Sequence, residues 1–239
     1  MKAMILAAGL GTRLRPLTDD RPKALVEVGG RTLLEICLER LRGFGVSEVI
    51  VNTHHYAAMI ETYLKAHENF GMRIEISRED ALLDTGGGLK QAAWFFLESG
   101  GDEPFIVHNV DVMSTIDLGA MVRFHQERGA LATLAVQERK SSRYLVFDEA
   151  GVLCGRETSL VRECGETKAL AFAGIHVVSP RLFGEMKEEG AFSIISAYLR
   201  MAGAGEKVVA FRADGWAWRD LGRVESVEAA EKLVHRSQF

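Results

Sequence analysis

Residues 1–23 read MKAMILAAGLGTRLRPLTDDRPK, and this stretch decides the fold that we expect. It opens with a short apolar run of the length of a buried strand. Gly9 and Gly11 follow, and two glycines allow the backbone to turn tightly and to approach a ligand. Successive N–H groups in such a turn can bind an anion, and Arg13 and Lys23 add charges suited to phosphate oxygens. The stretch predicts a strand and a polyphosphate loop; the alternative is a glycine-rich surface turn.

Two common phosphate motifs are not matched by this loop. The dinucleotide-binding fingerprint requires a third glycine three residues after the second, where this chain has Leu14. The P-loop ends in Gly-Lys-Ser or Gly-Lys-Thr, a triplet that the sequence does not contain. The missing glycine argues against a dinucleotide-dependent oxidoreductase, and so does the lack of an acidic residue at the expected spacing after a second strand.

The string from Leu6 to Lys23 resembles the signature of the sugar-1-phosphate nucleotidylyltransferases, enzymes with a GT-A-like fold. These enzymes join a nucleoside triphosphate to a sugar 1-phosphate and release pyrophosphate. The resemblance covers nearly the whole chain and is closest to the subgroup of N-acetylmuramate-1-phosphate uridylyltransferases and mannose-1-phosphate guanylyltransferases. It implies nucleotide binding by Ala8, Gly9, Gly11 and Thr12, and catalytic roles for Arg13 and Lys23.

Strand and helix patterns alternate along the 239 residues, which predicts an α/β fold. Thr32, with Glu35 three residues later, predicts the start of one of these helices. We expect a single Rossmann-like domain over residues 1–239, with three α/β/α layers around a mixed, mostly parallel central sheet. Residues 1–112 are expected to form its nucleotide-binding half, and residues 113–239 its sugar-binding half.

Composition excludes several other classes of protein. The net charge of −4 argues against a nucleic-acid partner, because nucleic-acid binders usually carry a basic excess. No apolar run of about 18 residues occurs, so we expect no membrane span. The three cysteines are odd in number and form no Cys-x-x-Cys pair, so we expect no disulfide framework and a cytoplasmic location. No long apolar exposed stretch demands a partner, and we expect a monomer or small homo-oligomer.

Two aspartates are the candidate metal ligands. Asp111 ends an apolar strand pattern, and ligands of open α/β sheets bind at the carboxyl ends of strands. Asp220 lies in a Trp-Arg-Asp-Leu-Gly-Arg segment that resembles the family's Trp-x-Asp-x-Gly-Thr. The resemblance implies that Asp111 and Asp220 hold Mg²⁺. The family usually has glycine before the first aspartate, and this chain has Val110.

Three further segments concern the base and the sugar. In Thr85-Gly86-Gly87-Gly88 the resemblance implies base contacts by Gly86 and Gly87; the alternative is a glycine-rich helix start without a ligand. The implied sugar-binding residues are Asn109, Glu157 and Gly174. Around Glu157 the chain lacks the Glu-Lys-Pro triplet that many members of the family have. The N-acetylmuramate subgroup lacks it too. This shared absence favours UTP and N-acetylmuramate 1-phosphate as the substrates.

The predicted reaction is attack by a phosphate oxygen of the sugar on the α-phosphorus of the triphosphate. That oxygen is already anionic, so the mechanism requires no protein base. Mannose, glucose or heptose 1-phosphate with GTP, UTP or dTTP remains an alternative. An alternative from another class of protein is a nucleotide-sensing module that binds the nucleotide but does not catalyse the reaction. Val110 and the missing Glu-Lys-Pro triplet support it.

Overall fold

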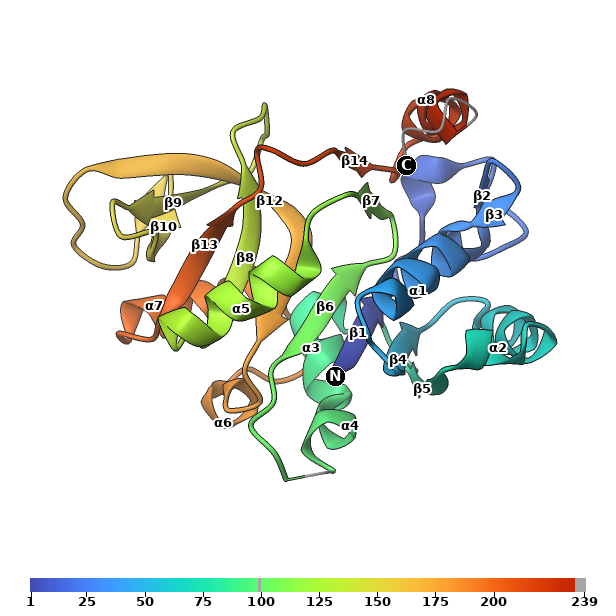
Figure 1. The fold of residues 1–239 in the computed structure, drawn as a ribbon, viewed down its shortest axis with the longest axis horizontal. Coiled ribbons are helices and arrows are strands. Elements are labelled where there is room, and N and C mark those ends of the chain that lie inside the picture. The colour runs from blue at the N-terminus through green and yellow to red at the C-terminus, as the bar shows by residue number, and fades with distance from the viewer. Residues whose placement is uncertain (99, 235–239) are drawn as a thin grey trace. The chain divides into compact units, whose positions relative to one another are not determined.

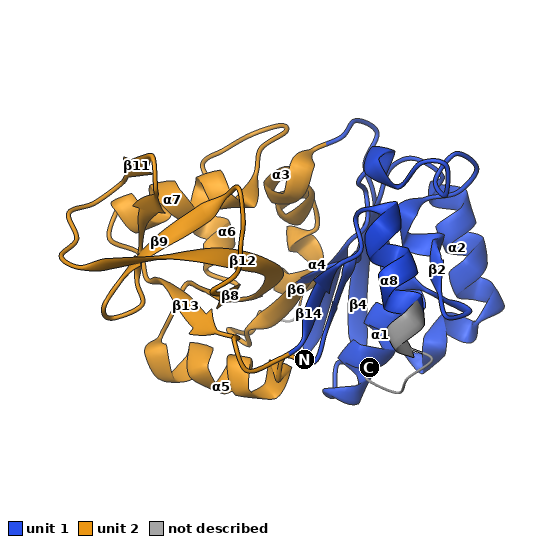
Figure 2. Cartoon of the chain, turned by 90° about the horizontal axis from the view of Figure 1, so that it is seen from above, with its two compact units in different colours: residues 1–82, 108–115, 217–239 blue, residues 83–107, 116–216 orange. Residues whose placement is uncertain are grey.

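The computed structural model describes residues 1–98 and 100–234. The described chain forms two compact units, coloured separately in Figure 2. Unit 1 contains residues 1–82, 108–115 and 217–239, and unit 2 contains residues 83–107 and 116–216. The chain passes from unit 2 into unit 1 within strand β6 (Phe105–Asn109).

Unit 1 is built around three parallel strands. β1 (Lys2–Leu6), β4 (Glu48–Thr53) and β5 (Arg73–Arg78) lie side by side in that order (Figure 1). Their registers place Ala3 opposite Val49, and Val49 opposite Ile74. The other elements of this unit are β2 (Glu27–Val28), β3 (Arg31–Thr32), α1 (Leu33–Gly43), α2 (Ala57–Ala66), β7 (Val112–Ser114), β14 (Trp218–Asp220), α8 (Val224–Val234) and the 3₁₀ helices Thr12–Leu14, Lys23–Leu25 and Glu68–Gly71.

Local sequence accounts for the strands and the first helix of unit 1. Met4 and Ile5 of β1 and Ile50 of β4 are completely buried, which explains why β1 and β4 read as apolar runs. Thr32 caps α1, because its hydroxyl oxygen accepts the N–H of Glu35 at 3.1 Å, as the sequence predicts.

Unit 2 combines one parallel pairing with an antiparallel meander. β12 (Thr167–Val178) pairs antiparallel with β8 (Ala132–Gln137) and β9 (Tyr144–Asp148), while β13 (Val208–Arg212) pairs parallel with β8. The remaining elements are β10 (Leu153–Arg156), β11 (Ser159–Leu160), α3 (Asp84–Gln91), α4 (Ala93–Leu97), α5 (Leu118–Arg128), α6 (Leu182–Glu185) and α7 (Ile194–Gly203). The predicted α/β class and mixed sheet are confirmed. No helix among the described residues is both long and apolar enough to cross a membrane.

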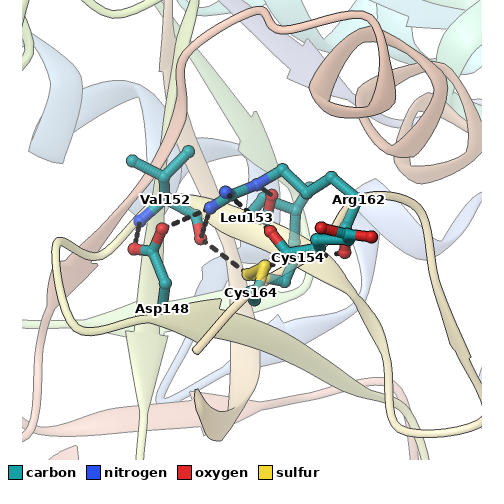
Figure 3. Close-up of a disulfide and its surroundings, with 7 residues drawn as sticks. Asp148, Val152, Leu153, Cys154, Arg162 and Cys164 are labelled. Carbon is teal, nitrogen blue, oxygen red and sulfur yellow. Dashed lines mark hydrogen bonds and ion pairs between the residues drawn. A yellow bond between two sulfur atoms is a disulfide. The ribbon is translucent and has the colours of Figure 1, made fainter. Parts of the chain in front are cut away.

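The expectation of no disulfide is wrong. Cys154 and Cys164 form one in unit 2, with 6.4 Å between their Cα atoms (Figure 3). Arg162 supports the same loop: its Nε donates to the main-chain oxygen of Leu153 at 3.0 Å, and its guanidinium pairs with Asp148. Partial burial is the largest single influence and acts to raise the pKa of the Asp148 carboxyl, but the hydrogen bond and charge of Arg162 together with main-chain hydrogen bonds outweigh it, so the pKa is lowered. The hairpin of β10 and β11 brings the two cysteines together, which their number and spacing do not reveal.

Loss of this disulfide is expected to destabilise the protein. Closing a loop of 10 positions restricts the unfolded chain, so Cys164→Ser should lower the free energy of unfolding by about 3 kcal/mol. Urea denaturation of the oxidised and dithiothreitol-treated proteins measures this difference. Reduced wild type should match the variant, and reductant should not change the variant further. Equal stability of oxidised and reduced wild type would contradict the prediction.

Candidate active site

The loop after β1 folds back onto Lys23. Gly11 has a φ of 64°, and a Cβ at this position would lie 3.0 Å from Thr18 Cγ2 and 3.2 Å from Lys23 Cβ. A Cβ on Gly9 would lie 3.6 Å from Lys23 Nζ. The Thr18 hydroxyl donates to the main-chain oxygen of Gly11 at 2.9 Å. Position 11 thus requires glycine for its backbone conformation and for space, and the lysine ammonium reaches the first glycine.

Lys23 forms an ion pair with Asp111, a residue 88 positions later in the chain. Its Nζ donates to Asp111 Oδ2 at 3.0 Å, and the two side chains are only 14% and 12% exposed. Because both charges are largely removed from water, each depends on the other for compensation. The structure therefore joins the predicted catalytic lysine to the predicted metal ligand.

A two-stranded antiparallel ribbon brings Asp111 and Asp220 together. β7 begins directly after Asp111, β14 ends at Asp220, and Val112 pairs with Asp220. The N–H of Leu221 donates to the main-chain oxygen of Asp111 at 2.8 Å. Asp111 is buried, whereas Asp220 is solvent-exposed. Two carboxylates that are far apart in sequence thus meet at one end of the ribbon.

Gly222 lies at the point where three predicted site residues converge. A Cβ built on it would lie 2.7 Å from Asp220 Oδ1, 2.9 Å from Arg13 Nη2 and 3.1 Å from Asp111 Oδ2. Its N–H donates to Asp220 Oδ1 at 2.7 Å, which orients that carboxylate. Sequence reasoning did not assign this glycine to the site, although it belongs to the Trp-x-Asp-x-Gly pattern.

Val110 does not keep Asp111 from facing Lys23. The valine is 2% exposed, has no positive φ, and donates its N–H to the main-chain oxygen of Leu6 at 3.2 Å. Its side chain therefore belongs to the core of unit 1. Asn109, the last residue of β6, is half-buried beside it in the chain.

The donor set near Gly222 fits a magnesium ion. Asp111 Oδ2 and Asp220 Oδ1 lie 3.1 Å and 2.7 Å from the Cβ position built on Gly222, so the two carboxylates are close together. Mg²⁺ is usually held by one or two carboxylates together with water and substrate phosphates. Within the described residues no group of three or more His, Cys, Asp or Glu side chains forms a metal site. Two carboxylates therefore suit an ion that takes its other ligands from substrate and water.

Gly86 and Gly87 lie at the start of α3, where close packing requires glycine. A Cβ on Gly86 would lie 2.3 Å from a ring carbon of Phe192, and one on Gly87 would lie 2.4 Å from the main-chain oxygen of Gly190. The N–H groups of both glycines point to the main-chain oxygen of Phe192, at 2.8 Å and 3.3 Å. Within unit 2, the segment before α7 thus occupies the backbone groups proposed to read the base.

Gly86→Ala is expected to destabilise the protein by about 1–3 kcal/mol, because the new methyl group overlaps the Phe192 ring. Gly184→Ala is the matched control, since a Cβ in that helix meets nothing within 4 Å and alanine favours helix by about 0.5–1 kcal/mol. Thermal denaturation of both variants measures the difference. Equal melting temperatures would contradict the packing at Gly86.

The remaining predicted residues, Glu157 and Gly174, lie in unit 2. Glu157 is exposed in the turn between β10 and β11. Gly174 has a φ of 75° and lies where the pairing of β12 with β8 shifts register, between Phe172 and His176. A β-bulge therefore explains the glycine within this strand. Sugar binding by the two residues stays a prediction.

A family model described as nucleotidyl transferase matches residues 2–237. The chain belongs to the nucleotidyl transferase family. It is 36% identical over 239 residues to N-acetylmuramate alpha-1-phosphate uridylyltransferase from Caulobacter vibrioides, covering 96% of this chain and 95% of the relative. It is 32% identical over 240 residues to the protein of the same name from Neisseria meningitidis, covering 98% of each. It is also 31% identical to a mannose-1-phosphate guanyltransferase from Yarrowia lipolytica, covering 93% of this chain and 61% of that protein.

Solved structures show the same fold. HddC from Yersinia pseudotuberculosis, complexed with GMP-PN, aligns with a TM-score of 0.78 and 22% identity, covering 98% of this chain and 99% of that chain. A UDP-glucose pyrophosphorylase complexed with UDP-glucose aligns with a TM-score of 0.77 and 20% identity, covering 99% of each chain. The family match and the curated relatives confirm the enzyme class predicted from the sequence, a sugar-1-phosphate nucleotidylyltransferase.

Proposed function

We propose that this enzyme transfers a uridylyl group from UTP to N-acetylmuramate 1-phosphate, giving a UDP-sugar and pyrophosphate. The convergence of Arg13, Asp111 and Asp220 around Gly222 supports the reaction, and so does the ion pair between Asp111 and Lys23. The two uridylyltransferase relatives, which match over nearly their whole length, support the choice of substrates.

In the proposed reaction a phosphate oxygen of the sugar attacks the α-phosphorus of UTP. A new P–O–P bond forms, the bond from the α-phosphorus to pyrophosphate breaks, and pyrophosphate leaves as an anion. Ala8, Gly9, Gly11 and Thr12 bind the triphosphate through the glycine-rich loop. Arg13 and Lys23 offset the negative charge that develops on the transferred and leaving phosphates. Catalysis thus consists of positioning and charge stabilisation.

Asp111 and Asp220 are the residues that would hold Mg²⁺. When bound, the ion would withdraw charge from phosphate oxygens and help to orient the triphosphate. Lys23 pairs with Asp111 in this structure, so the lysine also limits the repulsion between the carboxylate and an approaching phosphate.

The sugar and base contacts are part of the proposal. Asn109, Glu157 and Gly174 bind the sugar, and Gly86 and Gly87 lie against the base. The family resemblance supports these roles. Because the N–H groups of the two glycines face the main-chain oxygen of Phe192, the proposed base contact does not use those donors.

We also propose that residues 1–239 work as one domain, as a monomer or small homo-oligomer, with residues 1–112 serving the nucleotide and 113–239 the sugar. The nucleoside triphosphate substrate favours a cytoplasmic location. A reducing cytoplasm would keep Cys154 and Cys164 as thiols, the form that the denaturation experiment compares with the disulfide.

The test is pyrophosphate release with Mg²⁺ across a grid of GTP, UTP, ATP and dTTP against several sugar 1-phosphates. We expect the highest kcat/KM with UTP and N-acetylmuramate 1-phosphate. Preference for mannose, glucose or heptose phosphate would replace the proposed substrates. Nucleotide binding without release in any combination would instead favour a nucleotide-sensing module.

A further inference from the structure

Asn52 links the end of β4 to the start of the triphosphate loop. The parallel ladder between β1 and β4 ends with Leu6 opposite Asn52. The next N–H along the chain, that of Ala7, donates to Asn52 Oδ1 at 2.7 Å. The asparagine side chain thus continues the strand pairing by one hydrogen bond, into the segment that leads to Gly9.

The other end of the Asn52 amide is also held. Its Nδ2 donates to Glu79 Oε1 at 2.7 Å, and the two residues are 3% and 2% exposed. Glu79 is fixed in turn, because its N–H donates to the main-chain oxygen of Thr53 at 2.8 Å and His54 Nδ1 donates to its main-chain oxygen at 2.8 Å. The amide orientation follows from its partners, since an N–H requires an acceptor and a carboxylate requires a donor.

The chemistry of this link explains why asparagine is needed. One buried side chain must accept from a backbone N–H and donate to a carboxylate, and a primary amide does both. An aliphatic residue would leave the Ala7 N–H and a Glu79 oxygen without these partners, and unpaired buried polar groups are costly. Glu79 also lines a cavity of about 380 Å³ at the carboxyl ends of β4 and β5, together with His54 and Arg78.

We propose that Asn52 is a positioning residue for the triphosphate. It acts through Ala7, by fixing where the backbone leaves β1 and therefore where the loop from Ala8 to Thr12 presents its N–H groups. Glu79 supports this role because its carboxylate accepts from Asn52 Nδ2 and so fixes the orientation of the Asn52 amide. This inference rests on the proposed function, in which that loop binds UTP.

The test uses three variants of the full chain. Asn52→Ala removes both hydrogen bonds and should raise KM for UTP about tenfold while KM for the sugar 1-phosphate changes less than twofold. Asn52→Asp places two carboxylates together and should have a similar effect. The double variant Asn52→Asp with Glu79→Gln exchanges the positions of the amide and the carboxylate. The hydrogen bond between the two side chains can then form again, so this variant should regain a KM for UTP within about threefold of wild type.

Hydrogen exchange at the Ala7 amide provides a second readout that does not depend on turnover. We expect about tenfold faster exchange in Asn52→Ala, and near-wild-type exchange in the double variant. Unchanged exchange in Asn52→Ala, or faster exchange with unchanged KM and affinity for UTP, would overturn the inference. Absence of pyrophosphate release by wild type would contradict the proposed function alone, because UTP affinity and Ala7 exchange would still report on the loop.

Discussion

Asp111→Asn is expected to reduce kcat for pyrophosphate release about a thousandfold. The substitution preserves the shape of the side chain but removes the negative charge that faces Lys23 at 3.0 Å and that we assign to the metal. The loss should be in kcat, because charge stabilisation is most needed while the α-phosphorus exchanges one oxygen for another. Steady-state kinetics at saturating Mg²⁺ measures it.

Asp102→Asn is the matched control for this prediction. Asp102 is exposed in a loop and has no role in the proposed site, so its replacement should leave kcat within twofold of wild type. Thermal denaturation should show that both variants are folded. Turnover by a folded Asp111→Asn variant at the wild-type rate would remove Asp111 from the mechanism.

Gly222→Ala is expected to reduce kcat about a hundredfold while the fold survives. The added methyl group would lie 2.7–3.1 Å from Asp220 Oδ1, Arg13 Nη2 and Asp111 Oδ2. All three atoms are at the ends of side chains, which can move aside without unfolding the protein. Their displacement would, however, separate the groups that the reaction needs together.

Gly215→Ala is the matched control, because this glycine precedes Gly222 in the sequence and a Cβ on it meets nothing within 4 Å. It should retain wild-type kinetics. Circular dichroism and kinetics of the two variants separate a local effect at the site from a general effect of replacing glycine. Equal activity of Gly222→Ala and Gly215→Ala would show that the convergence at Gly222 is not needed for turnover.

Sequence patterns correctly predicted those strands and helices that depend only on neighbouring residues. The apolar run before Gly9 forms β1, and Thr32 caps α1 through Glu35, because strand burial and helix capping depend on neighbouring residues. The disulfide was missed because β10 and β11 create the proximity of Cys154 and Cys164, which lie 10 positions apart with no motif between them.

The site was predicted as separate residues rather than as an arrangement. Lys23 and Asp111 were assigned different roles, and their ion pair became visible only with the fold. Gly222 was missed because the need for glycine arises from three side chains, and two of them, Arg13 and Asp111, come from distant parts of the chain. Gly86 was expected to face the base, and the structure adds a packing reason for that glycine in the ring of Phe192.

The most direct test of the account follows oxygen from the sugar phosphate into the products. Wild type is incubated with UTP, Mg²⁺ and N-acetylmuramate 1-phosphate whose phosphoryl oxygens carry ¹⁸O, and the products are analysed by mass spectrometry. The account predicts one UDP-sugar for each pyrophosphate, with all the label in the UDP-sugar and none in pyrophosphate. Label in released phosphate, or pyrophosphate without a nucleotide sugar, would contradict attack by the sugar phosphate on the α-phosphorus.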